Sequence, residues 1–263
     1  MNKPRNPIII GAAVFAALAI GLIAYVLRPS PAPSGELEAV SIDIATQAAT
    51  QSVAESATEA ETEGESEPAA TEEDEVDSSS QSAETLGGIY EIDQSTSSVK
   101  FALNEILRGQ DKRVIGETNQ VAGQILIDAS NPVESQLGLI QVNARTLSTD
   151  SENRNRALRN EILDVDEFEF ITFEALIIEG LPQVIAVGES YTFDILGNLT
   201  IRDVVREVQF AAQVTIESDV RISGFASTVL LYADYGLTIP SVPFVASVDE
   251  EVELTIDFVA FAQ

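Results

Sequence analysis

Gly197-Asn-Leu-Thr-Ile-Arg-Asp-Val-Val-Arg-Glu-Val-Gln-Phe210 is the stretch that decides the fold, because two alternating strand patterns meet in it at a short polar joint. Side chains two residues apart in a strand share a face, and this rule pairs Leu199 with Ile201 and Val208 with Phe210. A joint as short as Arg202-Asp203 fits an antiparallel hairpin. Asp tolerates the left-handed backbone better than most residues, so we expect Asp203 to adopt it.

The same two-residue alternation recurs throughout residues 87–263 and is separated by turn residues such as Asn131-Pro132, Gly180 and Gly188. Several short strands joined by turns predict an all-β antiparallel sandwich or barrel. The alternating sets are Val99, Phe101, Leu103; Ile125, Ile127; Ile140, Val142, Ala144; Ile171, Phe173, Ala175; Tyr191, Phe193, Ile195; Val208, Phe210, Ala212, Val214; and Leu254, Ile256, Phe258.

One segment interrupts this pattern with helical composition. Thr149-Asp-Ser-Glu152 has the signature of a capping box, in which the side chains of the first and fourth residues cap the start of a helix. The composition stays helical as far as Glu161. A single helix inserted in an all-β run predicts a lid or plug over the mouth of a barrel.

The N-terminal part of the chain predicts a membrane anchor. Residues 8–27 are apolar and uncharged, with Lys3 and Arg5 before them and Arg28 after them. Twenty residues of helix reach about 30 Å, the thickness of the hydrocarbon core of a bilayer. We predict an uncleaved signal anchor over residues 1–28, with a cleaved signal peptide as the alternative. The basic N-terminus then stays in the cytoplasm, and the domain lies outside it, on a bacterial cell surface or in the periplasm.

Residues 29–86 read as a disordered linker. They are rich in Ser, Thr, Glu and Ala, and they contain 15 acidic residues and no basic residue. Such a sequence buries too little apolar surface to offset the entropy of ordering it. The segment is either a tether that holds the domain away from the membrane or a spacer of no particular length.

The composition excludes several classes of function. The chain has no His and no Cys, which removes Ser-His-Asp and Cys-His catalysis, zinc sites built from those residues, and iron–sulfur clusters. Residues 87–263 carry 28 acidic and 11 basic residues, a net charge of −17, which argues against nucleic acid and anionic lipid surfaces as partners. An acidic proteome or a saline habitat gives the same charge. The carboxylates at Asp164, Asp166, Glu167 and Glu169 lack the glycine and spacing of a calcium loop, so we predict no metal and no cofactor.

Four motifs in order resemble the YceI-like family. The central one runs from Thr149 to Phe173, with Arg before Leu158-Arg159, then Asp164-Val165, and finally Ile171-Thr-Phe173. Gly197-Asn-Leu-Thr-Ile201 is similar to the second signature of the family. The opening strand and the end of the domain also fit, through Tyr90-Glu-Ile-Asp93 and Asp234-Tyr-Gly236. The resemblance covers residues 89–261.

The resemblance implies an eight-stranded antiparallel lipocalin-like barrel with an apolar tunnel, in proteins regarded as binding polyisoprenoids or similar amphiphilic lipids. The chain departs from the family at four positions. The His that often precedes Leu-Arg is Ala157, the opening Trp is Tyr90, the Gly after Leu-Thr-Ile-x is Asp203, and the Arg before the Asp-aromatic-Gly motif is Tyr232. The loss of that His and that Arg leaves the chemistry of the ligand head group open.

The candidate ligand-binding residues are the inward-facing apolar side chains together with two arginines that match the family motif. Arg offers bidentate geometry to a phosphate or carboxylate head group. The alternatives are an ordinary core for the apolar set and a solvated helix face for the arginines, which would then pair with Glu152, Asp164 or Asp166. The candidates are Phe101, Leu103, Ile140, Val142, Arg154, Arg159, Ile171, Phe173, Phe193, Ile195, Phe210 and Ile256.

The leading hypothesis is therefore a membrane-tethered, non-enzymatic protein that binds a long-chain lipid or isoprenoid outside the cytoplasm. Its partners are this ligand and its own membrane, with a homodimer left open. The second hypothesis is a structural or protein-interaction barrel that its own side chains fill. The third, an enzyme that processes lipids, is disfavoured by the absence of His and Cys.

Overall fold

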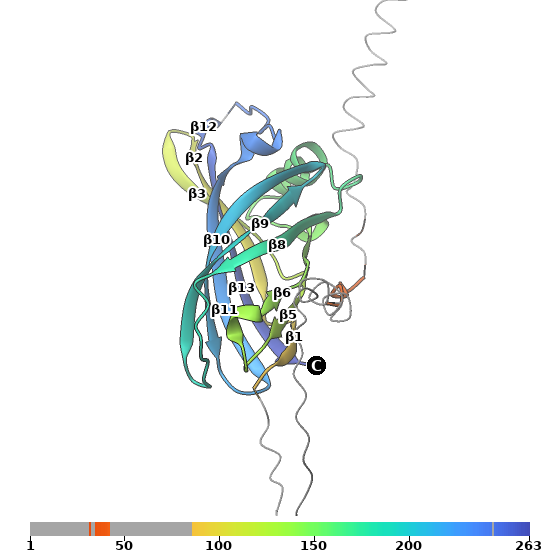
Figure 1. Cartoon of the computed structure of the whole chain (residues 1–263). Coiled ribbons are helices and arrows are strands. Elements are labelled where there is room, and N and C mark those ends of the chain that lie inside the picture. Colours follow the sequence, from red (N-terminus) through yellow and green to blue (C-terminus); the bar gives the residue numbers. More distant parts are fainter. Residues whose placement is uncertain (1–31, 33–34, 43–85, 244) are drawn as a thin grey trace, which may run out of the picture.

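The computed structural model describes residues 32, 35–42, 86–243 and 245–263, and within them a single antiparallel sheet curls around an apolar interior (Figure 1). Its strands are β1 (Gly88–Ile92), β2 (Ser98–Leu107), β3 (Gln110–Thr118), β4 (Val121–Ala122), β5 (Gln124–Ile127), β6 (Gln136–Leu137), β7 (Ile140–Asn143), β8 (Phe170–Glu179), β9 (Ser190–Ile201), β10 (Val204–Ile216), β11 (Arg221–Leu231), β12 (Val245–Val248) and β13 (Glu251–Ala262). The helical elements are η1 (Pro132–Glu134), η2 (Ala144–Thr146), α3 (Glu152–Ala157), η3 (Leu158–Ile162) and η4 (Tyr232–Tyr235).

The strands follow one another around the curl in the order β4-β7-β8-β9-β10-β11-β13-β1-β5-β6. β13 pairs with β1 and with β2 along the same edge. β2 in turn pairs with β3 and β12. The chain links the two ends of the path from β4 to β6, because β4 is followed by β5 after Gly123 alone, and β6 is followed by β7 after Gly138 and Leu139. The all-β antiparallel prediction is confirmed, with α3 and the short η helices as the helical exceptions within the described residues.

The hairpin predicted at residues 197–210 is confirmed, but the turn differs from the prediction. β9 and β10 pair from Val204 opposite Ile201 to Thr215 opposite Ser190. The left-handed residue is Arg202, with φ of 59°, so the expectation for Asp203 was wrong. The guanidinium carbon of Arg202 lies 5.6 Å from the centre of the Phe168 ring, and this cation–π contact stabilises Arg202 in the turn.

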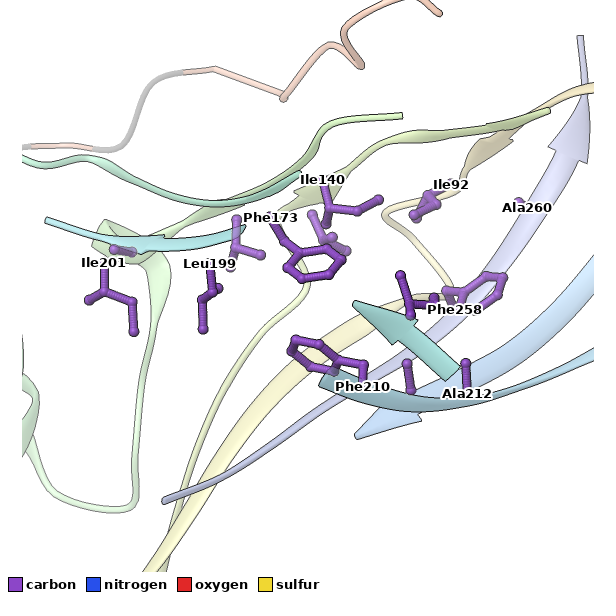
Figure 2. Packing of buried hydrophobic residues seen from close by; sticks show 14 of the residues in the cluster. Ile92, Ile140, Phe173, Leu199, Ile201, Phe210, Ala212, Phe258 and Ala260 are labelled. Atoms are coloured by element: carbon purple, nitrogen blue, oxygen red, sulfur yellow. The ribbon is translucent and has the colours of Figure 1, made fainter. Parts of the chain in front are cut away.

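The alternating side chains predicted from the sequence form the core. Leu199 and Ile201 are buried together, as are Phe210 and Ala212 on the neighbouring strand. Figure 2 shows these side chains converging with Phe173 and Phe258 inside the curl. The side chains that face the interior are therefore those that the alternation in the sequence predicted.

Three phenylalanine rings lie over glycines of neighbouring strands. A Cβ placed on Gly116 would fall 2.1 Å from the ring of Phe101, and one on Gly197 would fall 2.5 Å from the ring of Phe173. A Cβ on Gly224 would fall 3.0 Å from the ring of Phe258. Phe173 also meets Phe210 edge to face, with ring centres 5.0 Å apart (Figure 2). An aromatic ring that packs on a cross-strand glycine covers backbone that would otherwise have no side chain against it.

The predicted helix is present, but it starts differently from the predicted capping box. α3 begins after Ser151, whose side chain makes no capping hydrogen bond. Asn155 accepts hydrogen bonds from the backbone N–H of Thr149 at 2.6 Å and from its hydroxyl at 2.8 Å. The Thr149 hydroxyl accepts from the amide of Ser151 at 3.3 Å, and α3 begins after Ser151, so Thr149 is not the cap of the helix as predicted. Asn155 is buried, so its contact with Thr149 closes the loop before α3.

Part of the predicted linker contacts the domain. The amide of Ile42 donates to Oε1 of Gln124 at 3.0 Å, and Nε2 of Gln94 donates to the carbonyl of Leu37 at 2.7 Å. The side chain of Ile42 also packs beside Gly138. Residues 35–42 thus lie against the outside of the sheet at β5 and at the turn after β1. The linker as a whole, residues 29–86, stays a prediction.

The predicted anchor, residues 1–28, lies outside the described residues. Within the ranges that the structure describes, no helix is both long enough and apolar enough to cross a membrane.

Replacing Gly197 by Ala should lower the free energy of unfolding by about 1–3 kcal/mol, the usual range for overpacking a core. The new methyl group would lie 2.5 Å from the backbone oxygen of Glu174 and from the Phe173 ring, so strand or ring must move. Urea unfolding followed by circular dichroism measures the change. Thr192→Ala, at an exposed position of the same strand, is the control, and equal stabilities of the two variants would contradict the packing account.

Replacing Tyr235 by Phe should raise the free energy of unfolding by about 1 kcal/mol, because the buried hydroxyl of Tyr235 finds no hydrogen-bond partner among the described residues. Burial raises the pKa of this phenol from 10.0 to about 12. As the pH rises from 10 towards 12, the unfolded chain ionises first and the wild-type protein loses stability. The advantage of Tyr235→Phe in urea unfolding should therefore widen over that range, and a constant difference would argue against this assignment.

Candidate functional site

The curled sheet encloses a cavity of about 340 Å³. Pockets that hold small ligands in proteins begin at about this volume, roughly 300 Å³. Its wall comes from every described strand except β4, with most of the lining side chains on β2, β7, β8, β9, β10, β11 and β13. The wall is almost wholly carbon, since the alternation that builds the core also turns Val, Ile, Leu and Phe inward.

Eleven of the twelve candidate residues predicted from the sequence line this cavity. Arg159 does not; it lies outside the wall and donates to the carbonyl of Leu147 at 3.4 Å. Whether any of the twelve touches a ligand stays a prediction. The eleven that line the cavity are Phe101, Leu103, Ile140, Val142, Arg154, Ile171, Phe173, Phe193, Ile195, Phe210 and Ile256.

The helical segment closes one end of the cavity. Leu158 and Ile162 of η3, and Leu163 after it, line the wall, as do Leu237 and Ile239 in the connection that follows η4. Strand order places these segments together, because the starts of β8 and β13 and the end of β11 lie at the same end of the sheet. The helix therefore lies where the lid or plug was predicted. Tyr232, where the family often has Arg, also lines this end.

The opposite end is closed by the loop between β8 and β9. Leu181, Pro182 and Ile185 of this loop line the cavity, while Val184 is 75% exposed. The hydroxyl of Tyr191 accepts a hydrogen bond from the amide of Ala186 at 2.9 Å, which holds the loop against the start of β9. The two ends thus differ, one capped by a helix and the other by an apolar loop.

A buried ion pair lies in the wall at the helix end. Nη2 of Arg154 contacts Oε1 of Glu105 at 2.7 Å, and the Glu105 side chain is only 6% exposed. Arg154 also contacts Asp150 at 2.5 Å, and Asp150 in turn accepts from Nζ of Lys112 at 2.6 Å. The Lys112 hydrogen bond, with the charge of Arg154 added, lowers the pKa of the Asp150 carboxyl from its ordinary value of 3.8. Two acidic and two basic side chains therefore alternate from Glu105 on β2, through Arg154 on α3 and then Asp150, to Lys112 on β3.

Sequence reasoning missed Glu105, and the signal was present. Glu105 continues the inward row of Val99, Phe101 and Leu103 on β2, two residues beyond Leu103. A carboxylate at an inward position of an apolar row needs a partner, since a buried charge is costly unless it is paired. The residues of η3 that line the cavity were missed because helical composition alone does not say which face turns inward.

Replacing Lys112 by Gln should raise the pKa of the Asp150 carboxyl towards its ordinary value, because the strongest interaction that favours the ionised form is removed. Side-chain carbonyl NMR during an acid titration measures this pKa. Lys100→Gln is the matched control, since Lys100 contacts Asp257 and Glu117 rather than Asp150. An unchanged Asp150 titration in Lys112→Gln would contradict the network described above.

The sequence matches the model of the YceI-like domain family over residues 90–260. No curated protein sequence matches it.

Two solved structures are similar in fold. A polyisoprenoid binding domain from Saccharophagus degradans, implicated in plant cell wall breakdown, is 16% identical with a TM-score of 0.54, and the match covers 66% of this chain and 98% of that chain. BcnA from Burkholderia cenocepacia is 14% identical with a TM-score of 0.50, over 64% of this chain and 98% of that one. At such identities the likeness concerns the fold alone.

Proposed function

The chain belongs to the YceI-like domain family, and from this premise we propose that it binds a polyisoprenoid or a similar long-chain amphiphile in its cavity without transforming it. The observation that carries the proposal is the carbon-lined cavity inside the curled sheet. Each CH₂ group that such a wall shelters from water gains about 0.8 kcal/mol, so a long hydrocarbon chain is the ligand that this chemistry favours.

The strand pairing supports an eight-stranded barrel as the container. Four of its strands are bent and consist of consecutive segments: β1 with β2, β3 with β4 and β5, β6 with β7, and β12 with β13. The other four strands are β8, β9, β10 and β11. An eight-stranded barrel is wide enough to be filled by side chains or to hold one small ligand. A barrel filled by its own side chains would be the structural module. The cavity favours the other possibility, a barrel that holds a ligand.

A role without catalysis fits the residues available. The chain contains no His and no Cys, the side chains that most often act as general base or nucleophile near neutral pH. The charged side chains that line the cavity are held in ion pairs, Glu105 with Arg154 and Lys100 with Asp257, rather than directed at a common point. Binding and release of a lipid need neither a general base nor a nucleophile.

We place the domain outside the cytoplasm, tethered to its membrane through residues 1–28. The support is the charge-free apolar run at residues 8–27 with basic residues before it. A tether keeps a carrier at high local concentration near its lipid source. Protease treatment of intact cells tests this placement, since digestion of the domain without lysis is the expected result.

Co-purifying lipid tests the binding function. The match covers 98% of both solved relatives, so this fold exists as an independent unit, and residues 35–263 can be expressed without the anchor. Mass spectrometry of an organic extract should find a long-chain species at about one molecule per chain. A protein that carries no lipid and takes up no added isoprenoid would contradict the proposal and favour the self-filled barrel.

Replacing Phe193 by Gln should weaken the binding of a fluorescent long-chain lipid about tenfold, because a buried amide without a partner opposes an apolar ligand. Phe193 lines the cavity, whereas Phe225 on β11 is 42% exposed and does not. Phe225→Gln is therefore the matched control and should bind as the wild-type protein does. Equal losses in both variants would indicate general damage to the fold rather than a ligand contact.

A further inference from the structure

Glu105 and Arg154 give the cavity wall a charged pair at its helix end. Glu105 reaches inward from β2 and is buried, and Arg154 reaches it from α3. Of the described residues that line the cavity, Glu105 is the only acidic one, and Lys100 and Arg154 are the only basic ones. The response of this wall to a charged lipid depends first on Glu105 and Arg154, because the Lys100 ammonium contacts the half-exposed Asp257 and Glu117.

The positive charge of Arg154 is already balanced. One of its terminal nitrogens contacts Glu105 at 2.7 Å and the other contacts Asp150 at 2.5 Å. Lys112 lies directly opposite Glu105 in the pairing of β2 with β3, and it contacts Asp150 rather than the cavity. At the helix end of the cavity, the charges of two acidic and two basic side chains therefore balance one another.

Lys100 offers no free positive charge either. Its Nζ contacts Asp257 at 2.9 Å and Glu117 at 3.6 Å, and these three side chains belong to neighbouring strands β2, β13 and β3. The Asp257 hydrogen bond raises the pKa of the Lys100 amine, so the charged pair is favoured. Both basic side chains of the cavity wall are thus held by carboxylates.

We propose that Glu105 makes this cavity selective for long-chain lipids whose head group carries no negative charge, by occupying Arg154. A phosphate that contacts Arg154 must displace Glu105, and a buried carboxylate left without its cation is strongly unfavourable. An alcohol or a carbonyl head group needs no such displacement. This inference rests on the proposed lipid-binding function and names the ligand class of the same cavity.

Two lipids with the same chain test the selectivity: geranylgeraniol and geranylgeranyl phosphate, titrated into residues 35–263 at neutral pH. The wild-type chain should bind the alcohol at least about tenfold more tightly than the phosphate. In Glu105→Gln, the amide keeps the shape but not the charge, and Arg154 becomes available to the phosphate. The ratio of the two affinities should then fall about tenfold.

Two variants control for other causes. Glu251→Gln removes the same charge from an exposed position at the same end of the sheet, and its ratio should equal that of the wild type. Adding Arg154→Met to Glu105→Gln should restore the preference for the alcohol, because the phosphate then loses its cation. A Glu251→Gln ratio that falls as far as that of Glu105→Gln would assign the effect to net charge and overturn the proposal.

The outcomes separate this inference from the proposed function. A wild-type chain that binds the phosphate as tightly as the alcohol overturns the selectivity, whatever the variants do, and leaves lipid binding standing. An unchanged ratio in a folded Glu105→Gln protein also overturns it. Failure of the wild-type chain to bind either lipid would instead contradict the proposed function itself.

Discussion

The packing of phenylalanine rings on cross-strand glycines is the constraint on which the rest of the structure depends. Gly116, Gly197 and Gly224 leave room on the inner face of the sheet, and the rings of Phe101, Phe173 and Phe258 occupy that room. Each ring lies along the wall over its glycine and also lines the cavity. Large apolar side chains thereby cover the backbone without filling the centre of the curl.

The cavity follows from this arrangement, and its two ends acquire different chemistry from the connections that close them. The loop between β8 and β9 brings only apolar side chains to one end. The connection between β7 and β8 brings α3 to the other, and with it Arg154. Burial of Glu105 beside this arginine puts a charged pair at the helix end of a largely carbon-lined wall, so the helix end is where the wall can distinguish head groups.

Much of the fold could be predicted because strand alternation is a local property. The inward rows, the hairpin at Arg202-Asp203 and the position of the helix all follow from spacing within a few residues. The predictions that failed concern side-chain contacts that the strand pattern does not specify. Arg202 rather than Asp203 is left-handed where its guanidinium meets Phe168, and Thr149 bonds Asn155 instead of capping the helix. Arg159 matched the family motif and lies outside the wall of the cavity, and its contact with a ligand stays a prediction.

The sequence by itself determined the class of fold, the family and the apolar character of the interior, because side-chain period and motif order are written along the chain. Only the tertiary structure decided which charges face that interior. Glu105 and Arg154 are 49 residues apart, and nothing in the spacing of either predicts their contact. Their pairing arises because the curl of the sheet brings β2 beneath α3, where a buried carboxylate is stable only beside a cation.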